Sequence, residues 1–226
     1  MRGIGIALAW PQTLCKQAGA WYDKPLRWFG INKNNYYKVG HSAIVLINPK
    51  NGNCHYFDFG RYHSPAQHGR VRSAFTDHEL EIKTKAKINS DGGLENFKEI
   101  VLELLYNTSC HGTGSLHAAY CKLNYNTALH KAIQLQQASP IRYGPFLPQG
   151  TNCSRFVNKV LLAGKPSFLH KLLLTAPKTL TPTPIGNVTA LDNYFVVSLV
   201  DTASTFSIRG NFKINWLKYK LAHEKS

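Results

Sequence analysis

Alternating runs of hydrophobic and polar residues predict a series of short strands in the first part of the chain. Residues 3–10 form an apolar run that Pro11 ends, and residues 37–47 carry the strongest strand pattern in the sequence. Residues 48–53 include an Asn-Gly pair, which tolerates the positive φ angles of hairpin turns. We therefore expect residues 54–59 to return as a strand antiparallel to the one before.

The pattern changes after this hairpin. Residues 61–72 are basic and predict a loop, whereas residues 79–88 alternate in the manner of a strand with one face in solvent. Residues 94–106 repeat apolar side chains at helical spacing and predict an amphipathic helix. The rest of the chain predicts a strand at 116–123, helices at 128–138, 153–163 and 168–174, an extended proline-containing segment at 179–188 and a strand at 194–200.

This order of elements predicts an α+β fold in which an antiparallel sheet packs against helices. A chain of 226 residues is long enough for one sizeable domain. We expect residues 1–190 to form that domain. Residues 191–226, a late strand followed by a basic tail, are expected as an addition packed on the same domain.

The chain carries a large positive charge. It has 27 Lys and Arg against 12 Asp and Glu, which gives a formal net charge of +15. Such a charge favours an anionic partner, such as an acidic polymer, nucleic acid, phospholipid headgroups or cell-wall material. Net charge indicates what a protein associates with and not which reaction it catalyses. It does not by itself predict an obligatory nucleic-acid partner. No stretch of the sequence reaches the roughly 18 apolar residues of a membrane span.

Cysteine usage bears on the cellular compartment. The five cysteines are an odd number and lack the tight spacing of a disulfide framework. They predict reduced thiols and a cytoplasmic protein. The basic and apolar start of the chain imitates a signal peptide, but its apolar run is short and no small-residue cleavage pattern follows. Secretion is therefore the lesser alternative.

The strongest chemical signal lies between Gly150 and Val157. A polar loop brings Cys153 to the start of a segment that predicts a helix, which Thr151 or Asn152 can cap. Because a helix N-terminus favours a negative charge, a cysteine at this position is a candidate nucleophile. The alternative is a small core cysteine in a capped helix.

A histidine and an aspartate on the predicted hairpin supply partners for that cysteine. His41 opens an apolar strand, and the hairpin should place residues 59–61 opposite it, so that Asp58 is a near neighbour. A carboxylate beside an imidazole fixes its tautomer and stabilises the imidazolium. Cys153, His41 and Asp58 therefore combine as nucleophile, general base and orienting acid. Taken singly, His41 could be a hydrogen-bonded strand-edge histidine and Asp58 a capping aspartate at a turn.

The order of these motifs resembles that of the circularly permuted papain-like proteins, which include NlpC-type amidases and peptidases and lecithin–retinol acyltransferase-like enzymes. The similar stretches are a histidine that opens a hydrophobic strand (41–47), a polar residue on the next strand (Asp58) and a Cys-Ser pair before apolar helix positions (153–157). The resemblance covers roughly residues 37–165, and local strings also look like an uncharacterised bacterial family. Many permuted members carry Glu or His where Asp58 stands.

The resemblance implies thiolate chemistry on an acyl group, with a peptide or acyl substrate and no cofactor. Cys153 would attack an amide or ester carbonyl, His41 would move the proton, and Asp58 would orient His41. The oxyanion would be held by the backbone amide of Cys153 and by a second donor. Candidates for that donor are Gln149, Asn152 and Tyr37.

Two stretches supply candidates for substrate binding. The basic loop after Asp58 suits a carboxylate or phosphate, because arginine presents a fork of donors; the alternative is a solvated charged loop. A rigid aromatic turn begins at Tyr143, just before the cysteine loop. The residues predicted to bind substrate are Arg61, His63, Tyr143, Asn152 and Gln149, and the loop also carries His68, Arg70 and Arg72.

Other motifs were weighed against simpler interpretations. Cys110, His111, His117 and Cys121 match no common zinc-ligand spacing, so no metal site is expected. Residues 181–187 could wall the cleft beside the cysteine or form a surface strap. The aromatic and cationic tail from Lys213 suits an amphipathic docking segment or a polymer contact. A non-catalytic basic module that binds nucleic acid or an anionic polymer is the alternative to the enzyme.

Overall fold

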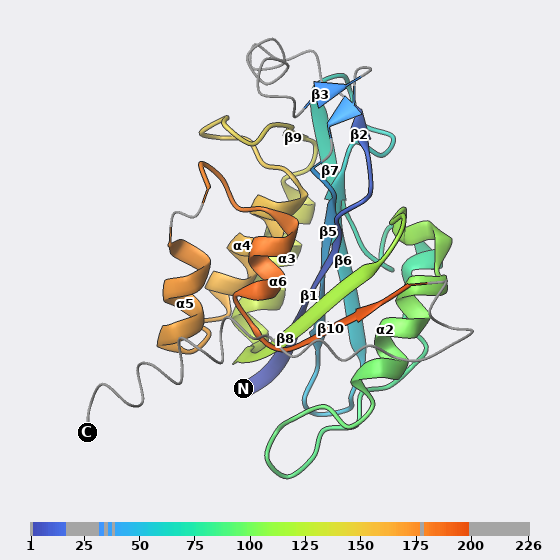
Figure 1. The fold of residues 1–226 in the computed structure, drawn as a ribbon, viewed down its shortest axis with the longest axis vertical. Helices are drawn as coiled ribbons and strands as arrows, with labels where there is room; N and C mark the ends of the chain where they lie inside the picture. The colour runs from blue at the N-terminus through green and yellow to red at the C-terminus, as the bar shows by residue number, and fades with distance from the viewer. Residues whose placement is uncertain (1, 17–31, 34–35, 38, 177–178, 199–226) are drawn as a thin grey trace.

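The computed structural model describes residues 2–16, 32–33, 36–37, 39–176 and 179–198. Seven strands form one antiparallel sheet in the order β10-β8-β1-β5-β6-β7-β9 (Figure 1). Their bounds are β1 Arg2–Trp10, β5 His41–Ile47, β6 Cys54–Gly60, β7 His68–Arg72, β8 Leu116–Asn124, β9 Ile141–Arg142 and β10 Asp192–Val197. A second, three-stranded sheet consists of β2 Cys15–Lys16, β4 Tyr36–Tyr37 and β3 Asn32–Lys33.

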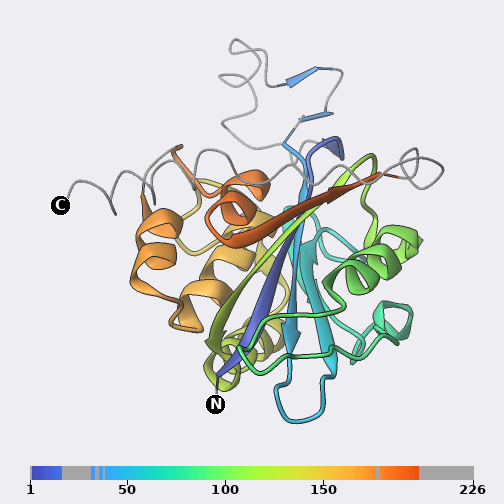
Figure 2. The same cartoon turned by 60° about the horizontal axis from the view of Figure 1, so that its bottom comes forward.

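Helices cover both faces of the large sheet. The helices α3 to α6 lie on one side and α2 lies on the other, as both views show (Figures 1 and 2). Their bounds are α2 Phe97–Tyr106, α3 Tyr125–Gln137, α4 Cys153–Ala163, α5 Phe168–Thr175 and α6 Pro184–Thr189, with short 3-10 turns at η1 His78–Leu80 and η2 Thr108–Cys110. The protein is therefore a mixed α/β structure built around a large antiparallel sheet.

The two faces of the sheet define two apolar cores. On β1, Ile6 and Leu8 point into the core under α2, while Ala7 and Ala9 face the core under α3 and α4. This alternation follows from the pleat of a strand, which sends successive side chains to opposite faces. Strands with both faces covered read as continuous apolar runs, and for that reason β1 and β5 were recognisable in the sequence.

Most predicted elements are present. The strands at 3–10, 54–59 and 116–123 correspond to β1, β6 and β8, and the hairpin turn joins β5 to β6. The helices at 94–106, 128–138, 153–163 and 168–174 correspond to α2, α3, α4 and α5, with shifts of up to three residues at their starts. The strand at 194–200 begins earlier, at Asp192, and pairs with β8, so it completes the large sheet.

Four predictions of local structure were wrong. The strand at 37–47 is interrupted, because Gly40 has φ +74 and separates β4 from β5. The loop at 61–72 ends in a strand, β7, that pairs with β6. The expected strand at 79–88 instead begins in the 3-10 turn η1, and among the described residues only Ile88 forms a bridge, with Leu94. The Lys83 and Thr84 amides donate to the Glu103 carboxylate. The extended segment at 179–188 includes α6, which Thr183 caps.

The predicted basic tail from Lys213 lies outside the described residues. Within the described part of the chain, no helix is long and apolar enough to cross a membrane.

Candidate functional site

The backbone of β5 places His41 at the edge of a cavity. His41 pairs with Trp10 across β1 and β5, and the two rings stack with centroids 5.8 Å apart. Gly40 precedes it with a left-handed backbone, and a Cβ there would lie 2.8 Å from the Trp10 carbonyl oxygen. His41 is 6% exposed. The histidine is thus held by the sheet on one side and reaches the rim on the other.

Asp58 lies fully buried on β6 and faces three side-chain partners. His41 Nε2 is 3.2 Å from Asp58 Oδ2, and the Tyr56 hydroxyl donates to the same oxygen at 3.1 Å. Arg72, on β7, donates to both carboxylate oxygens, from Nε at 3.0 Å and from Nη2 at 2.6 Å. Because β6 lies between β5 and β7, the carboxylate is held from both neighbouring strands.

The charges of this cluster follow from its contacts. Burial raises the pKa of Asp58, but hydrogen bonds from His41 and Arg72 outweigh it and lower the pKa below its ordinary value. Burial lowers the pKa of His41, yet its contacts with Asp58 and with the Cys153 side chain raise it to about 9. At neutral pH the site therefore holds an imidazolium beside the Asp58 carboxylate and the Cys153 side chain.

Cys153 is the first residue of α4. The Asn152 side chain caps this helix by accepting from the Arg155 amide at 2.8 Å, as the sequence predicted for Thr151 or Asn152. Cys153 is 5% exposed and lies close enough to His41 to raise its pKa. With Nε2 of His41 directed to Asp58, Nδ1 is the ring nitrogen left for the sulfur. The helix start, the histidine and the aspartate are brought together from three separate stretches of chain.

The loop that leads to Cys153 is closed by its own hydrogen bonds. Thr151 and Tyr143 form an isolated parallel bridge, and the Gly144 amide donates to the Thr151 carbonyl oxygen at 2.9 Å. The Arg155 guanidinium donates to the carbonyl oxygens of Gly144, Pro145 and Leu147 at 2.8 to 3.2 Å. Arg155 thus holds the loop against the first turn of α4.

A cavity of about 280 Å³ opens beside His41. Arg61 and Tyr143 lie on its wall, and the Arg61 guanidinium sits 5.1 Å from the centre of the Tyr143 ring. Cys153 does not itself line this cavity. The lining residues are Thr13, Leu14, Cys15, His41, Phe59, Gly60, Arg61, Tyr62, His111 and Tyr143.

The other predicted substrate-binding residues are placed elsewhere. His63 is exposed with φ 45, and Gln149 is exposed in the closed loop. Neither lines the cavity. The Asn152 side-chain oxygen is committed to the helix cap. The structure therefore brings Arg61 and Tyr143 to the histidine and leaves His63, Gln149 and Asn152 outside the cavity wall.

Two arginines of the predicted basic loop belong to internal ion pairs. Arg70 donates to both oxygens of Asp77, at 2.7 and 2.5 Å, and to the Tyr62 carbonyl oxygen. Arg72 pairs with Asp58 and lies 3.6 Å from the centre of the Tyr62 ring. The expected cationic loop was wrong for these two residues, because β7 turns their side chains toward the carboxylates of Asp77 and Asp58.

Sequence reasoning missed several residues of this site. Arg72 carried no motif, since its role depends on β7 pairing with β6. Tyr62 and His111 stack with ring centroids 5.2 Å apart and come from distant stretches. Cys15 lines the cavity and belongs to the small sheet. Burial raises the pKa of its thiol to about 12, and the charge of Cys153 acts in the same direction. A strand prediction for 68–72 was the one signal that could have pointed to Arg72.

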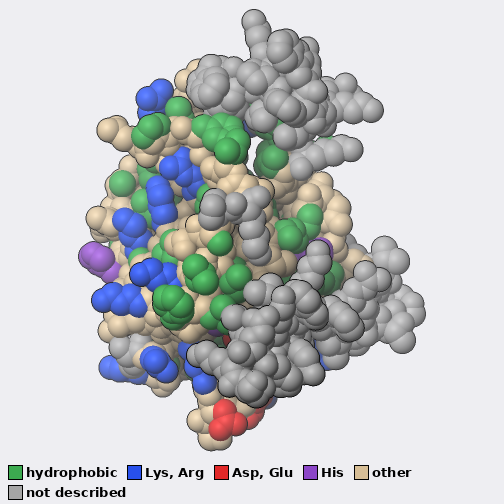
Figure 3. All heavy atoms as spheres, turned by 60° about the vertical axis from the view of Figure 1, so that its left-hand side comes forward, with side chains coloured by type: hydrophobic (Ala, Val, Ile, Leu, Met, Phe, Trp, Pro, Cys, Tyr) green, Lys and Arg blue, Asp and Glu red, His purple; other side chains and the backbone are tan. Residues whose placement is uncertain are grey.

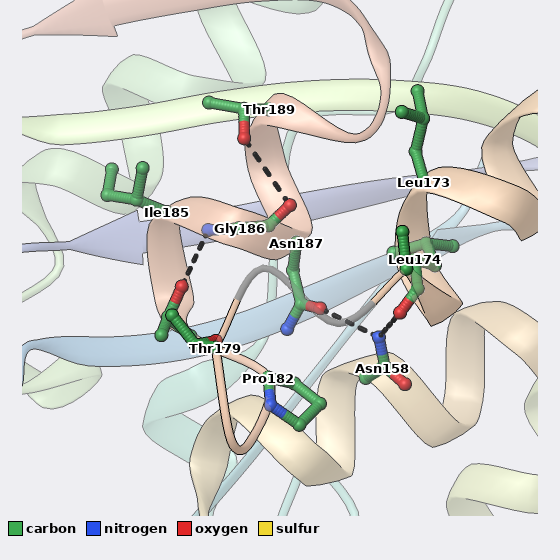
Figure 4. Close-up of a pocket in the computed structure, with 11 residues that line it drawn as sticks. Asn158, Leu173, Leu174, Thr179, Pro182, Ile185, Gly186, Asn187 and Thr189 are labelled. Carbon is green, nitrogen blue, oxygen red and sulfur yellow. Dashed lines mark hydrogen bonds between the residues drawn. The ribbon is translucent and has the colours of Figure 1, made fainter.

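A second cavity, of about 230 Å³, lies on the far side of α4 (Figure 4). Asn158 donates to the Leu174 carbonyl oxygen at 3.0 Å and to the Asn187 side chain at 3.1 Å. Asn187 in turn donates to the carbonyl oxygen of Ser154 at 2.8 Å. Asn187 was predicted to wall the cleft or to form a surface strap. It is instead buried and fastens α6 to the first turn of α4.

The cysteines and histidines at 110–121 are dispersed. Cys110 is buried near Tyr56, and His117 contacts the Tyr194 hydroxyl and the Ser115 hydroxyl. Among the described residues, no group of three or more His, Cys, Asp or Glu side chains is placed to hold a metal ion.

Comparison with known proteins assigns this structure to a class. An antiparallel sheet with helices on both faces and a Cys, His and Asp cluster is a mixed α/β fold with a candidate thiol site. The sequence model of the TseH-like type VI secretion system effectors matches residues 5–168. The chain therefore belongs to the TseH-like family of type VI secretion system effectors.

The fold is also similar to a solved structure. The crystal structure of the type VI secretion system effector TseH matches with a TM-score of 0.59 and 19% sequence identity, over 91% of this chain and 98% of the other. At this identity the likeness concerns the fold alone. No curated protein sequence matches the chain.

The family bears on the predicted compartment. Its description refers to a secretion system, whereas cysteine usage predicted a cytoplasmic protein and made secretion the lesser alternative. The family favours that alternative. Cysteine usage indicates the redox state of a compartment, and a cleavage pattern indicates export through a signal peptide. Neither signal predicts whether a protein is exported by a specialised secretion system.

Proposed function

We propose that this protein is a thiol hydrolase or acyltransferase of the peptidase or amidase type, acting on an amide or ester bond. Cys153 is the nucleophile, His41 the general base and Asp58 the residue that orients His41. The observation that carries the proposal is that His41 lies 3.2 Å from the buried Asp58 carboxylate and also contacts the Cys153 side chain. The order of the three motifs, which resembles the permuted papain-like proteins, adds support.

In this mechanism the proton of the Cys153 thiol rests on His41 as the imidazolium, and the sulfur attacks the substrate carbonyl carbon. The C–N or C–O bond then breaks, and His41 returns the proton to the leaving amine or alcohol. Water, or another acceptor, attacks the resulting thioester while His41 takes its proton, and the Cys153 sulfur leaves with that proton still on His41, which restores the starting pair. Asp58 stabilises the imidazolium between these steps.

The oxyanion needs donors fixed before the reaction. The Cys153 backbone amide lies in the first turn of α4, where amides lack a partner within the helix. The second donor is proposed among Gln149, Asn152 and Tyr37. Of these, Tyr37 is buried on β4, which pairs with the strand of Cys15 at the cavity.

The cavity suggests the kind of substrate. Arg61 and Tyr143 present a cation and an aromatic face beside His41. An acyl or peptide substrate that carries a carboxylate near the scissile bond fits this wall. Residues 1–190 hold every group in this mechanism, with β10 completing the sheet beside them. The family description supports export of the protein as a type VI effector.

The first experiment measures iodoacetamide labelling of each cysteine against pH by mass spectrometry, for the wild type and for His41→Ala. We expect Cys153 to react well below pH 8 and at least about tenfold faster than the others, because burial raises the pKa of Cys15, Cys54, Cys110 and Cys121 to about 12. His41→Ala should remove that advantage.

A second candidate function rests on the net charge of +15. A non-catalytic basic module would bind nucleic acid or an anionic polymer through salt-sensitive contacts that survive Cys153→Ala. If Cys153 labels no faster than Cys15, the enzyme proposal fails and this module becomes the explanation.

A further inference from the structure

Carboxylates are distributed unevenly along the chain. Residues 104–191 contain no Asp or Glu, although the whole chain has 12. This acid-free stretch forms the entire helical layer from α3 to α6 on one side of the sheet. The acidic residues between Asp77 and Glu103 instead accompany η1 and α2, on the opposite side. Among the described residues, carboxylates are therefore concentrated on the α2 side of the sheet.

The cations of the helical layer lie close together. Burial lowers the pKa of Lys159, and the charges of Arg155 and Lys131 lower it further, so α3 and α4 present their cations to one another. Lys165, just before α5, and Lys171, within α5, are both exposed. Figure 3 shows Lys and Arg side chains scattered with hydrophobic ones over this face, with acidic side chains only at its lower edge.

Helix α5 projects apolar side chains from this cationic layer. Phe168 is 83% exposed and Leu172, one turn later, is 51% exposed. The inner face of the same helix is well packed, since His170 and Leu174 are buried there. The helix needs Leu174 for folding, but Phe168 and Leu172 contribute little to the core.

A third exposed apolar residue follows in the next segment: Leu180 is 94% exposed. The first carboxylate after the acid-free stretch, Asp192, lies 3.1 Å from His170 Nε2 on the packed side of α5. It therefore does not oppose the lysines on the outer side of the helix.

We propose that the outer face of α5, with Phe168, Leu172, Lys165 and Lys171, binds the surface of an anionic lipid bilayer. Apolar side chains flanked by lysines are the pattern of interfacial helices, whose apolar face enters the headgroup region while each lysine gains electrostatic attraction. The geometry favours lipid over an acidic protein. Helix α5 lies at the outer edge of the layer (Figure 1). Its exposed Phe168 and Leu172 do not line the cavity beside it.

The test uses the full chain and sedimentation with phosphatidylcholine vesicles, with and without phosphatidylglycerol. We expect binding that requires phosphatidylglycerol and weakens as salt is raised. Phe168→Ser combined with Leu172→Ser should lower the partition coefficient at least about tenfold, because two exposed apolar side chains no longer enter the lipid. The matched control is Phe75→Ser with Tyr106→Ser, which removes two equally exposed aromatics elsewhere (66% and 58%).

A charge variant separates the two contributions. Lys165→Gln with Lys171→Gln should weaken binding several-fold, whereas Lys83→Gln with Lys85→Gln, on the α2 side, should not. Cys153 labelling at the wild-type rate verifies that each variant is folded. Equal binding to neutral vesicles, or unchanged binding of the Phe168 and Leu172 variant, overturns the proposal. Binding that soluble polyglutamate abolishes equally in the wild type and in that variant assigns the face to an anionic polymer instead.

Discussion

At the scale of single residues, the site depends on how Asp58 is surrounded. Its carboxylate accepts from Arg72 and Tyr56 and contacts His41, and these partners stabilise its ionised form although it is fully buried. Arg72 makes two of the four side-chain contacts of the carboxylate, one to each oxygen. His41 nevertheless has its pKa raised to about 9, because burial is outweighed by Asp58 and Cys153. The charge of the imidazole is therefore coupled to folding.

This coupling predicts a loss of stability with rising pH. A histidine with a raised pKa contributes its full stability below the unfolded value of about 6.5 and loses it as the pH rises through about 9. We expect the free energy of unfolding to fall by roughly 2 kcal/mol between pH 6.5 and 8.5. The measurement is urea unfolding across this range, compared with His41→Gln. If the variant falls by the same amount, His41 is not the group responsible.

At the scale of elements, α4 is the part on which the site depends most. Asn152 caps its start, Arg155 holds the preceding loop, and Asn187 reaches from α6 to the carbonyl oxygen of Ser154. Asn158 closes the network from the next turn (Figure 4). The position of Cys153 is thus set by side chains from two other segments as well as by its own helix.

Truncating Asn187 should lower the free energy of unfolding more than truncating another polar side chain of α6. We expect Asn187→Ala to lower the free energy of unfolding by about 2 kcal/mol, because Asn158 loses a buried partner and the Ser154 carbonyl loses a donor. Thr189→Ala, on the same helix, removes only a local 3.4 Å contact and should change it by less than about 0.5 kcal/mol. Chemical denaturation measures both variants. Equal losses would mean that the network has no special role.

At the scale of the whole molecule, one sheet serves two cores. Strand β1 is central: β5 and β8 pair with it along nearly its full length, and its side chains from Ile6 to Ala9 have no exposed surface. Strands β9 and β10 lie at the edges. The cores under α2 and under α3 to α6 therefore share their inner wall.

Hydrogen exchange should follow this arrangement. We expect the amides of β1 to exchange most slowly, through global unfolding, because both neighbours must separate before they open. Amides of β10 should exchange faster, since one edge is unpaired within the sheet and its register shifts between Asp192 and Phe195. Exchange measured by mass spectrometry or NMR tests the order. Protection of β10 equal to that of β1 would contradict it.

The sequence was informative where local chemistry and burial agreed. The Asn-Gly turn of the β5–β6 hairpin predicts that Asp58 lies near His41, and Ala43 pairs with Asp58 as that register requires. The cap and apolar face of α4 located Cys153 at a helix start. The predictions of a loop at 61–72 and of a strand at 79–88 were wrong, because the pattern of side chains does not reveal which backbone groups will pair.

The sequence by itself determined the central strands, most helices and the three candidate reactive residues, because periodicity, caps and turns act within a few residues of chain. Only the tertiary structure decided that Arg72 and Tyr56 hold Asp58, that Arg61 rather than His63 faces the cavity, and that Asn187 braces α4. It also gathered the acid-free helices on one side of the sheet. Such contacts join residues far apart in the chain, and strand pairing and helix packing alone bring them together.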